Sequence, residues 1–198
     1  EVQSPKSGDG PGVLLLPGSR ADEVRRHLPV VTQVFELMRK AIPASRGKMV
    51  VPSDALIEMA KSFGLPPGLE IQVGGLANAL AQADIAITKS GTITMECAAF
   101  GVPAVVFYKT SWLTYLVGRQ IATVKYLARP NLLVNEEIYP EFIQHEATAE
   151  NISRAALELL RDESHRAVIK TKLAKVIASL GGPGASKRAA AAIVRLLR

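Results

Sequence analysis

The sequence contains one cysteine, Cys97, which lies in an apolar run with helical periodicity. A single thiol excludes a disulfide framework and a cysteine zinc site, and it is typical of a buried structural cysteine in a reducing compartment. Long hydrophobic runs are also missing, because Gly, Pro, Lys or Arg interrupts each apolar segment before it reaches the roughly 20 residues that span a bilayer. No secretory signal opens the chain, so we expect a soluble protein.

Several motifs of nucleotide and hydrolase chemistry are missing as well. The sequence has no Walker lysine motif, no Gly-x-Ser-x-Gly elbow and no Gly-x-Gly-x-x-Gly after the first predicted strand, which argues against a kinase, a hydrolase and a dinucleotide-binding enzyme. No Asp-x-Asp pair could hold a metal-bound diphosphate, and His27, His145 and His165 show no ligand spacing. We therefore expect surface histidines, no metal and no cofactor.

Basic residues exceed acidic ones, with 24 Lys and Arg against 18 Asp and Glu, which gives a formal charge of +6. This excess suits nucleotides, nucleic acid or an anionic membrane surface, and it selects none of them. With 198 residues and 48% hydrophobic content, the chain can bury a substantial core. We expect one domain at residues 13–180, preceded by a linker at residues 1–12 and followed by a helix at residues 181–198.

Short apolar runs alternate with helical segments along the chain. The runs predict strands at residues 13–16, 49–51, 70–73, 85–88, 104–107 and 130–134. Helices are predicted at residues 19–41 with a break at Pro29, and at residues 53–63, 76–82, 92–100, 149–160, 164–180 and 185–198. This alternation indicates an α/β fold, a Rossmann-like open parallel sheet of about six strands with helices on both faces.

The strand at residues 85–88 runs directly into Ser90, Gly91 and Thr92 and then into a helix. Ser90 is a good N-cap, Gly91 lets a ligand approach the main chain, and free amides at the helix start favour a phosphate. Glu96 lies further along the same helix, where its carboxylate could accept hydrogen bonds from the two hydroxyls of a ribose. This combination suggests a nucleotide site, although most Ser-capped turns of this kind bind nothing.

Two further loops are predicted at the same edge of the sheet. Residues 17–20 and residues 74–75 each follow a strand, and ligands of open parallel sheets bind beyond the carboxyl ends of the strands. Without a metal, a leaving diphosphate must be stabilised by amides, a helix dipole and cations. Arg20 could supply one of these cations, and the alternative for Arg20 is a helix-face ion pair with Asp22 or Glu23.

The stretch from Ser111 to Arg129 interleaves aromatic and apolar residues with basic ones. As a helix, it could lie on an anionic membrane surface or contact an acyl chain. A helix packed on the sheet with solvated basic positions is an equally good interpretation.

Five separated motifs resemble the lipid-A-disaccharide synthases in order and spacing. They are Leu15-Leu16-Pro17-Gly18-Ser19-Arg20 with Glu23, Ser90-Gly91-Thr92 with Glu96, Tyr108-Lys109, Pro130-Asn131-Leu132-Leu133 and Pro140-Glu141-Phe142-Ile143-Gln144. The similarity runs from about Val13 to Ile152. On this resemblance the chain is similar to the carboxyl-terminal, UDP-donor-binding half of a two-domain GT-B glycosyltransferase, without the amino-terminal acceptor domain.

The resemblance implies an inverting hexosyltransferase of lipid A biosynthesis. It would transfer 2,3-diacylglucosamine from its UDP derivative to 2,3-diacylglucosamine 1-phosphate and release UDP. Its nucleotide-sugar site would comprise Ser19 and Arg20 at the diphosphate, Ser90, Gly91 and Thr92 also at the diphosphate, Glu96 at the ribose, and Asn131 and Gln144 along the donor side. The catalytic base and the acceptor face would belong to the other half, so we expect this chain alone to bind UDP without turnover.

The resemblance also implies a cytoplasmic enzyme, peripheral at the inner face of the bacterial inner membrane. One alternative is another UDP-sugar enzyme of the same fold, such as the N-acetylglucosaminyltransferase of peptidoglycan synthesis or an epimerase. A second alternative is a non-catalytic nucleotide-binding or nucleic-acid-binding module. We rank nucleic acid low, because the predicted strands lack interleaved surface aromatics and no recognition helix is evident.

Overall fold

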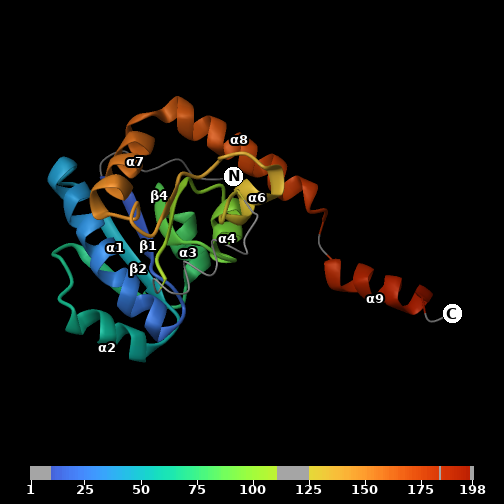
Figure 1. The fold of residues 1–198 in the computed structure, drawn as a ribbon, viewed down its shortest axis with the longest axis horizontal. Helices are drawn as coiled ribbons and strands as arrows, with labels where there is room; N and C mark the ends of the chain where they lie inside the picture. Colours follow the sequence, from blue (N-terminus) through green and yellow to red (C-terminus); the bar gives the residue numbers. More distant parts are fainter. Residues whose placement is uncertain (1–9, 111–124, 183, 197–198) are drawn as a thin grey trace.

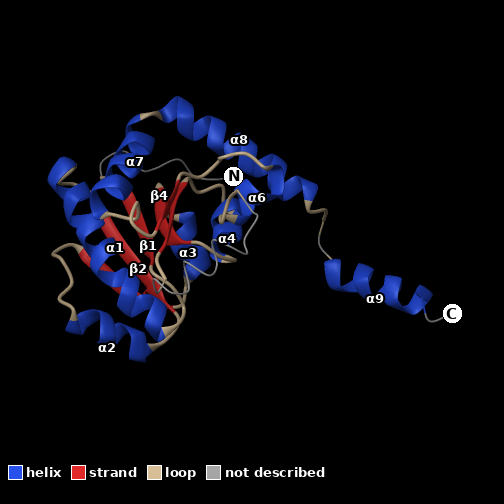
Figure 2. Cartoon of the chain, viewed as in Figure 1, coloured by secondary structure: helices blue, strands red, loops and turns tan. Residues whose placement is uncertain are grey.

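A computed structural model describes residues 10–110, 125–182 and 184–196. At its centre is a sheet, drawn in red in Figure 2. The sheet has six strands in the order β3-β2-β1-β4-β5-β6, with parallel pairing throughout. The strands are β1 (Gly12–Leu16), β2 (Arg46–Val51), β3 (Leu69–Val73), β4 (Ile85–Lys89), β5 (Ala104–Tyr108) and β6 (Glu141–Ile143). The Rossmann-like parallel sheet expected from the sequence is confirmed.

Helices cover both faces of this sheet (Figure 1). They are α1 (Ala21–Ala41), α2 (Asp54–Ser62), α3 (Leu76–Ala81), α4 (Ile93–Ala99), α6 (Arg129–Val134), α7 (Ala149–Arg161), α8 (Glu163–Ser179) and α9 (Ala185–Leu196). Helix α1 packs against α2 and α7, whereas α4 packs against α6 and α8. Helix α9 stands apart from the sheet (Figure 1). Among the described residues, no helix combines the length and the apolar character needed to cross a membrane.

The most deeply buried part of the core includes strands β1, β4 and β5. Leu15, Ile87 and Val105 are fully buried, because helices cover their strands on both faces. Helix α1 adds an apolar stripe that includes Val24 and Phe35, both fully buried. This packing holds the first turn of α1 beside the carboxyl ends of β1 and β4, where the candidate site lies.

The sixth strand is not where the sequence pattern placed it. Residues 130–134 form most of α6, and the strand that pairs with β5 is β6, which comes later. The run Leu132-Leu133-Val134 is exposed rather than buried. Pro130 stands at the start of α6, where its fixed φ suits a helix and its missing N–H costs nothing. The apolar run is therefore strand-like in composition only, and it forms an exposed helical turn.

The predicted break at Pro29 is also wrong, since α1 continues through this residue. Pro29 is exposed, so water can reach the helical carbonyl that loses its N–H partner. The buried stripe of α1 lies on the opposite side and includes Leu28 and Val31. Burial of this stripe outweighs the local cost of one proline.

The aromatic and basic stretch proposed for membrane contact falls largely outside the described residues. Residues 111–124 are not described, and Arg129 is the first residue of α6.

Candidate functional site

The candidate site lies where the strand order reverses. From β1 the chain adds β2 and β3 on one side, then returns to place β4 beside β1 and adds β5 and β6 on the other side. Because strand–helix–strand crossovers are right-handed, the helices after β1 and β4 leave toward opposite faces. Doubly wound sheets bind their ligands between these two loops, and we call this position the crevice. The loop at Gly74-Gly75 follows β3, two strands away from β1.

Two glycines allow both loops to turn sharply at the crevice. Gly18 has φ of 143° and Gly91 has φ of 141°, which are backbone conformations that other residues rarely adopt. A Cβ atom on Gly18 would come within 2.9 Å of the side chain of Glu23. Glycine at position 18 therefore leaves room for the Glu23 carboxylate directly beneath the loop.

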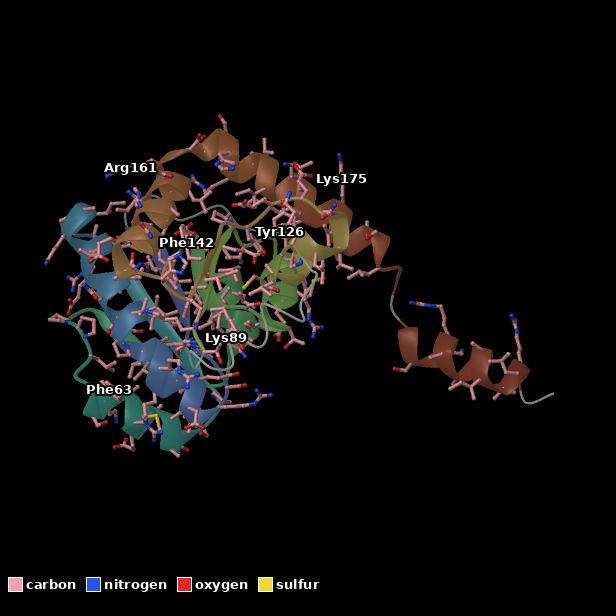
Figure 3. The ribbon with its side chains drawn as sticks, in the orientation of Figure 1. Phe63, Lys89, Tyr126, Phe142, Arg161 and Lys175 are labelled. Atoms are coloured by element: carbon pink, nitrogen blue, oxygen red, sulfur yellow. The ribbon has the colours of Figure 1, made fainter. Side chains whose placement is uncertain are left out.

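The carboxylate of Glu23 gathers three donors, and we call this group the Glu23 cluster. It accepts a hydrogen bond from the main-chain N–H of Ser19 at 3.2 Å and contacts Nη1 of Arg20 at 3.3 Å. Nζ of Lys89 donates to the same carboxylate at 2.8 Å, from the end of β4 (Figure 3). The side chains of Glu23 and Lys89 are 17% and 18% exposed. The cluster therefore joins the loop after β1 to the end of β4.

The electrostatics of the cluster favour an ionised carboxylate. Burial alone would raise the pKa of Glu23, but the hydrogen bonds from Lys89 and Ser19 and the charges of Lys89 and Arg20 together lower it. The Arg20 side chain is 81% exposed, so its pairing with Glu23 is weak and easily exchanged. Two cations and one amide thus converge on a single anion, and an incoming phosphate would meet the same donors.

The turn after β4 differs in detail from its prediction. Thr92, not Ser90, is the N-cap of α4, and no side chain caps the helix. Both donors of Ser90 are engaged, since its N–H donates to the carbonyl of Phe107 at 2.9 Å and its hydroxyl donates to that of Leu127 at 2.8 Å. The main-chain N–H groups of Thr94 and Met95 donate to the carbonyls of Gly91 and Thr92, so the amides of Gly91 and Thr92 are the ones suited to an anion. Glu96 is exposed in the first turn of α4.

Asn131 is fully buried and its amide is saturated. Its Oδ1 accepts from the main-chain N–H groups of Ile138 and Tyr139, at 2.9 Å each. Its Nδ2 donates to the carbonyl of Tyr139 at 2.7 Å and to Oε1 of Glu141 at 2.8 Å. The Glu141 carboxylate accepts in turn from the amides of Leu127 and Ala128. We call Asn131, Tyr139 and Glu141 the Asn131 network, and it reaches Ser90 through Leu127.

Gln144 lies at the end of β6, with φ of 52°. Its side-chain amide pairs with the main chain of Thr110, with Oε1 accepting at 2.7 Å and Nε2 donating at 3.3 Å. Together with Arg26, Lys109, Thr110 and His145, it lines an open hollow of about 420 Å³. Gln144 therefore borders a basic hollow next to the crevice, and its exposed fraction is 8%.

Sequence reasoning missed three residues of this region. His27 was expected at the surface, but its side chain is fully buried under the loop after β1. Its spacing from Val24 and Val31 on α1 places it on the buried stripe, which is a signal that the sequence carried. Lys89 follows a buried strand directly, and Glu141 stands inside a recognised motif, yet their partners are distant in sequence.

Comparison with known proteins matches this geometry to a family. The profile of the lipid-A-disaccharide synthetase family matches residues 7–195. The chain is 34% identical to the lipid-A-disaccharide synthase of Syntrophus aciditrophicus over 197 residues, covering 94% of this chain and 49% of that protein. It is also 34% identical to the enzyme of Synechocystis sp. over 190 residues, covering 92% and 48%. The chain thus spans about half the length of the curated relatives that it matches.

Solved structures share the fold at low sequence identity. The calicheamicin glycosyltransferase CalG4 superposes with a TM-score of 0.63 at 22% identity, covering 98% of this chain and 44% of that chain. A mutant of S. aureus TarM, in complex with fondaparinux, alpha-GlcNAc-glycerol and UDP, gives 0.59 at 12% identity, covering 90% and 34%. These likenesses show the fold alone, which is one half of a GT-B fold. The family profile and the two curated relatives go further and show that this chain belongs to the lipid-A-disaccharide synthase family.

Proposed function

We propose that this chain is the donor half of a lipid-A-disaccharide synthase and binds the UDP of UDP-2,3-diacylglucosamine. The complete protein would transfer the sugar, with inversion, to 2,3-diacylglucosamine 1-phosphate and release UDP. The observation that carries this proposal is the convergence of Arg20, Lys89 and the Ser19 amide on one carboxylate at the switch point of the sheet. The curated relatives support the choice of reaction.

The diphosphate would lie in the crevice between the loops after β1 and β4. Arg20 would turn from Glu23 to the phosphate oxygens, which costs little because it is largely exposed. Gly91 and Thr92 would present main-chain amides, and Ser19 its hydroxyl. Negative charge grows on UDP as the glycosidic bond breaks, and these donors would stabilise it without a metal.

Three further residues would complete the donor side. Glu96 is exposed on α4 and would accept hydrogen bonds from the ribose hydroxyls. Asn131 would act as a positioning residue, because its saturated amide holds Glu141 and, through Leu127, the Ser90 turn. Gln144 would shape the wall of the basic hollow next to the diphosphate.

The remaining partners belong to the complete protein. An amino-terminal half would present the lipid acceptor and the catalytic base, so that this chain alone binds UDP without turnover. We propose a peripheral association with the cytoplasmic face of the bacterial inner membrane, since both substrates carry acyl chains. The stretch from Ser111 to Arg129 remains our candidate for contact with anionic lipid.

Titration calorimetry of the 198-residue chain with UDP tests the proposal. We expect saturable binding that is unchanged when Mg²⁺ is added. Substitution Arg20→Ala should weaken binding about tenfold, the value of one charge-assisted hydrogen bond. The matched control is Arg25→Ala, because Arg25 forms a similarly exposed i,i+3 pair with Asp22 on the same helix. A folded sample that shows no binding to UDP would refute the proposal.

Competition between nucleotide sugars distinguishes the reaction from that of other UDP-sugar enzymes with this fold. UDP-2,3-diacylglucosamine should displace UDP at lower concentration than unacylated UDP-glucosamine, because acyl chains add apolar contacts. Equal competition, or preference for the unacylated sugar, would favour a peptidoglycan or epimerase type of enzyme. Salt-sensitive binding to random oligonucleotides with no response to UDP would instead favour a nucleic-acid-binding module.

A further inference from the structure

His27 links the loop after β1, which borders the crevice, to the loop after β5. Its ring lies 2.6 Å from the carbonyl oxygen of Pro17 through Nδ1 and 3.0 Å from that of Lys109 through Nε2. The ring also meets Phe107 of β5 edge to face, with 4.9 Å between centroids and an interplanar angle of 81°. The side chain is fully buried. One imidazole therefore contacts the loop after β1, the loop after β5 and β5 itself.

Both ring nitrogens face carbonyl oxygens, which only accept hydrogen bonds. A neutral imidazole carries one N–H, so it can donate to one of the two carbonyls, whereas an imidazolium can donate to both. Burial lowers the pKa of His27 and is the largest effect on it. The hydrogen bonds to the carbonyls of Pro17 and Lys109 and the charge of Glu23 raise the pKa by less, and Lys89 lowers it slightly further. The ring is therefore neutral near pH 7. The contact with Pro17 is the shorter of the two, which favours a proton on Nδ1.

The Pro17 carbonyl belongs to the same planar peptide unit as the N–H of Gly18. A hydrogen bond that fixes this carbonyl therefore also fixes the orientation of the peptide plane before Gly18. Gly18 then turns the chain with a φ of 143°. The next amide is that of Ser19, which donates to Glu23 in the Glu23 cluster. The orientation of the imidazole thus determines where the Ser19 amide and the Arg20 side chain leave the main chain.

We propose that His27 is a positioning residue of the loop after β1, and that its Nδ1–H holds the Pro17 carbonyl so that Ser19 and Arg20 face the crevice. The identity of the ligand as UDP rests on the proposed function, but the tautomer and the order of the loop do not. His27 contacts neither the ligand nor the reacting atoms, and it acts through Pro17 and Gly18.

Nitrogen-15 NMR of the wild-type chain near pH 7 tests the tautomer directly. The chemical shifts of the two ring nitrogens identify which one carries the proton. We expect His27 to be protonated at Nδ1. Protonation at Nε2 would overturn the proposal, because the only N–H would then point at Lys109.

Two amide substitutions separate the two contacts. In His27→Asn the side-chain NH₂ group can take the place of Nδ1, whereas in His27→Gln it can take the place of Nε2. We expect the Ser19 amide hydrogen to exchange about tenfold faster in His27→Gln and at nearly the wild-type rate in His27→Asn. UDP should bind about tenfold more weakly to His27→Gln and within about twofold of wild type to His27→Asn.

The control is His165→Asn, since His165 is exposed on α8, and this variant should match wild type in both measurements. Equal exchange and equal UDP affinity in the two His27 variants would contradict the proposal, because a ring that only fills space would not distinguish them. If the wild-type chain fails to bind UDP, the proposed function fails, while the tautomer and exchange measurements still decide the role of His27.

Discussion

The crevice has two walls that are built from different kinds of contact. The Glu23 cluster joins three charged side chains and one main-chain amide, and its member Arg20 is 81% exposed, whereas Glu23 and Lys89 are partly buried. The Asn131 network consists of buried hydrogen bonds to the main chain, and Asn131 and Tyr139 are fully buried. Exposed ion pairs exchange partners at low cost, whereas a buried polar group that loses its partner costs about 1–3 kcal/mol.

This difference assigns separate tasks to the two walls. The Glu23 cluster keeps two cations and an amide assembled around an anion, and its carboxylate can yield them to a phosphate. The Asn131 network has no donor to spare, because both atoms of the amide are used within the chain. It holds the turn after β4 in place. We therefore expect variants of the first wall to change ligand affinity and variants of the second to change stability.

The largest loss of stability should follow from Asn131→Ala. This change removes four hydrogen bonds and leaves the N–H groups of Ile138 and Tyr139 without a buried acceptor. We expect the free energy of unfolding in urea to fall by about 3 kcal/mol. The matched control is Leu132→Ala, since Leu132 is the next residue of α6 and is 45% exposed. If Asn131→Ala lowers the free energy of unfolding no more than Leu132→Ala does, the Asn131 network does not have the stabilising role that separates it from the Glu23 cluster.

Lys89→Met should reduce stability less than Asn131→Ala does, and it should weaken the binding of UDP more. Lys89 and Glu23 form a partly buried ion pair, so its loss should lower the free energy of unfolding by about 1 kcal/mol. UDP affinity should fall about tenfold, because one of the two cations at the crevice is lost. The control is Lys61→Met, whose ion pair with Glu58 is exposed and lies outside the crevice.

The same variant has a pH signature. The pKa of Glu23 is below its ordinary value of 4.5 in the folded chain, so the ionised carboxylate stabilises the fold above that pH. This stability is lost as the pH falls through the folded-state pKa. Lys89→Met should raise the pKa of Glu23 and so flatten the fall in unfolding free energy between about pH 5 and about pH 3. An unchanged acid limb would show that Lys89 does not control this carboxylate.

The sequence predicted the parts of the molecule that local chemistry determines. Buried parallel strands are continuous apolar runs, so β1, β4 and β5 were found, as were the glycine turns that follow β1 and β4. Strand β6 has only three residues, and no local pattern separates it from a loop. The run after Asn131 has the composition of a strand, and the position of Pro130 and the bonds from Asn131 to Tyr139 and Glu141 favour the helix instead.

The sequence predicted the loops of the candidate site, but it did not predict the side chains that hold these loops in place. Ser19, Arg20, Gly91 and Thr92 follow strands directly, and the topology alone brings them to one edge. The supports are contacts across long sequence separations, such as His27 with Lys109. Periodicity shows which face of a helix is buried, but it does not show which buried atom meets which. The periodicity of α1 therefore carried the burial of His27, although we expected this residue at the surface, but it did not carry the partners of the ring.

The smallest loss of stability should come from Ser90→Ala, because Ser90 connects the Asn131 network to the proposed phosphate turn through a single side-chain hydrogen bond. Its hydroxyl donates to the carbonyl of Leu127, which the Asn131 network holds, while Gly91 and Thr92 follow it in the proposed phosphate turn. If Ser90 only anchors the turn, unfolding free energy should fall by about 0.5–1 kcal/mol and UDP affinity should stay within about twofold of wild type. If its hydroxyl also serves the diphosphate, affinity should fall about tenfold with the same loss of stability. Calorimetry and urea unfolding on one preparation decide between these outcomes. The first would leave the ligand contacts at this turn to Gly91 and Thr92, because the Ser90 amide already donates to the carbonyl of Phe107.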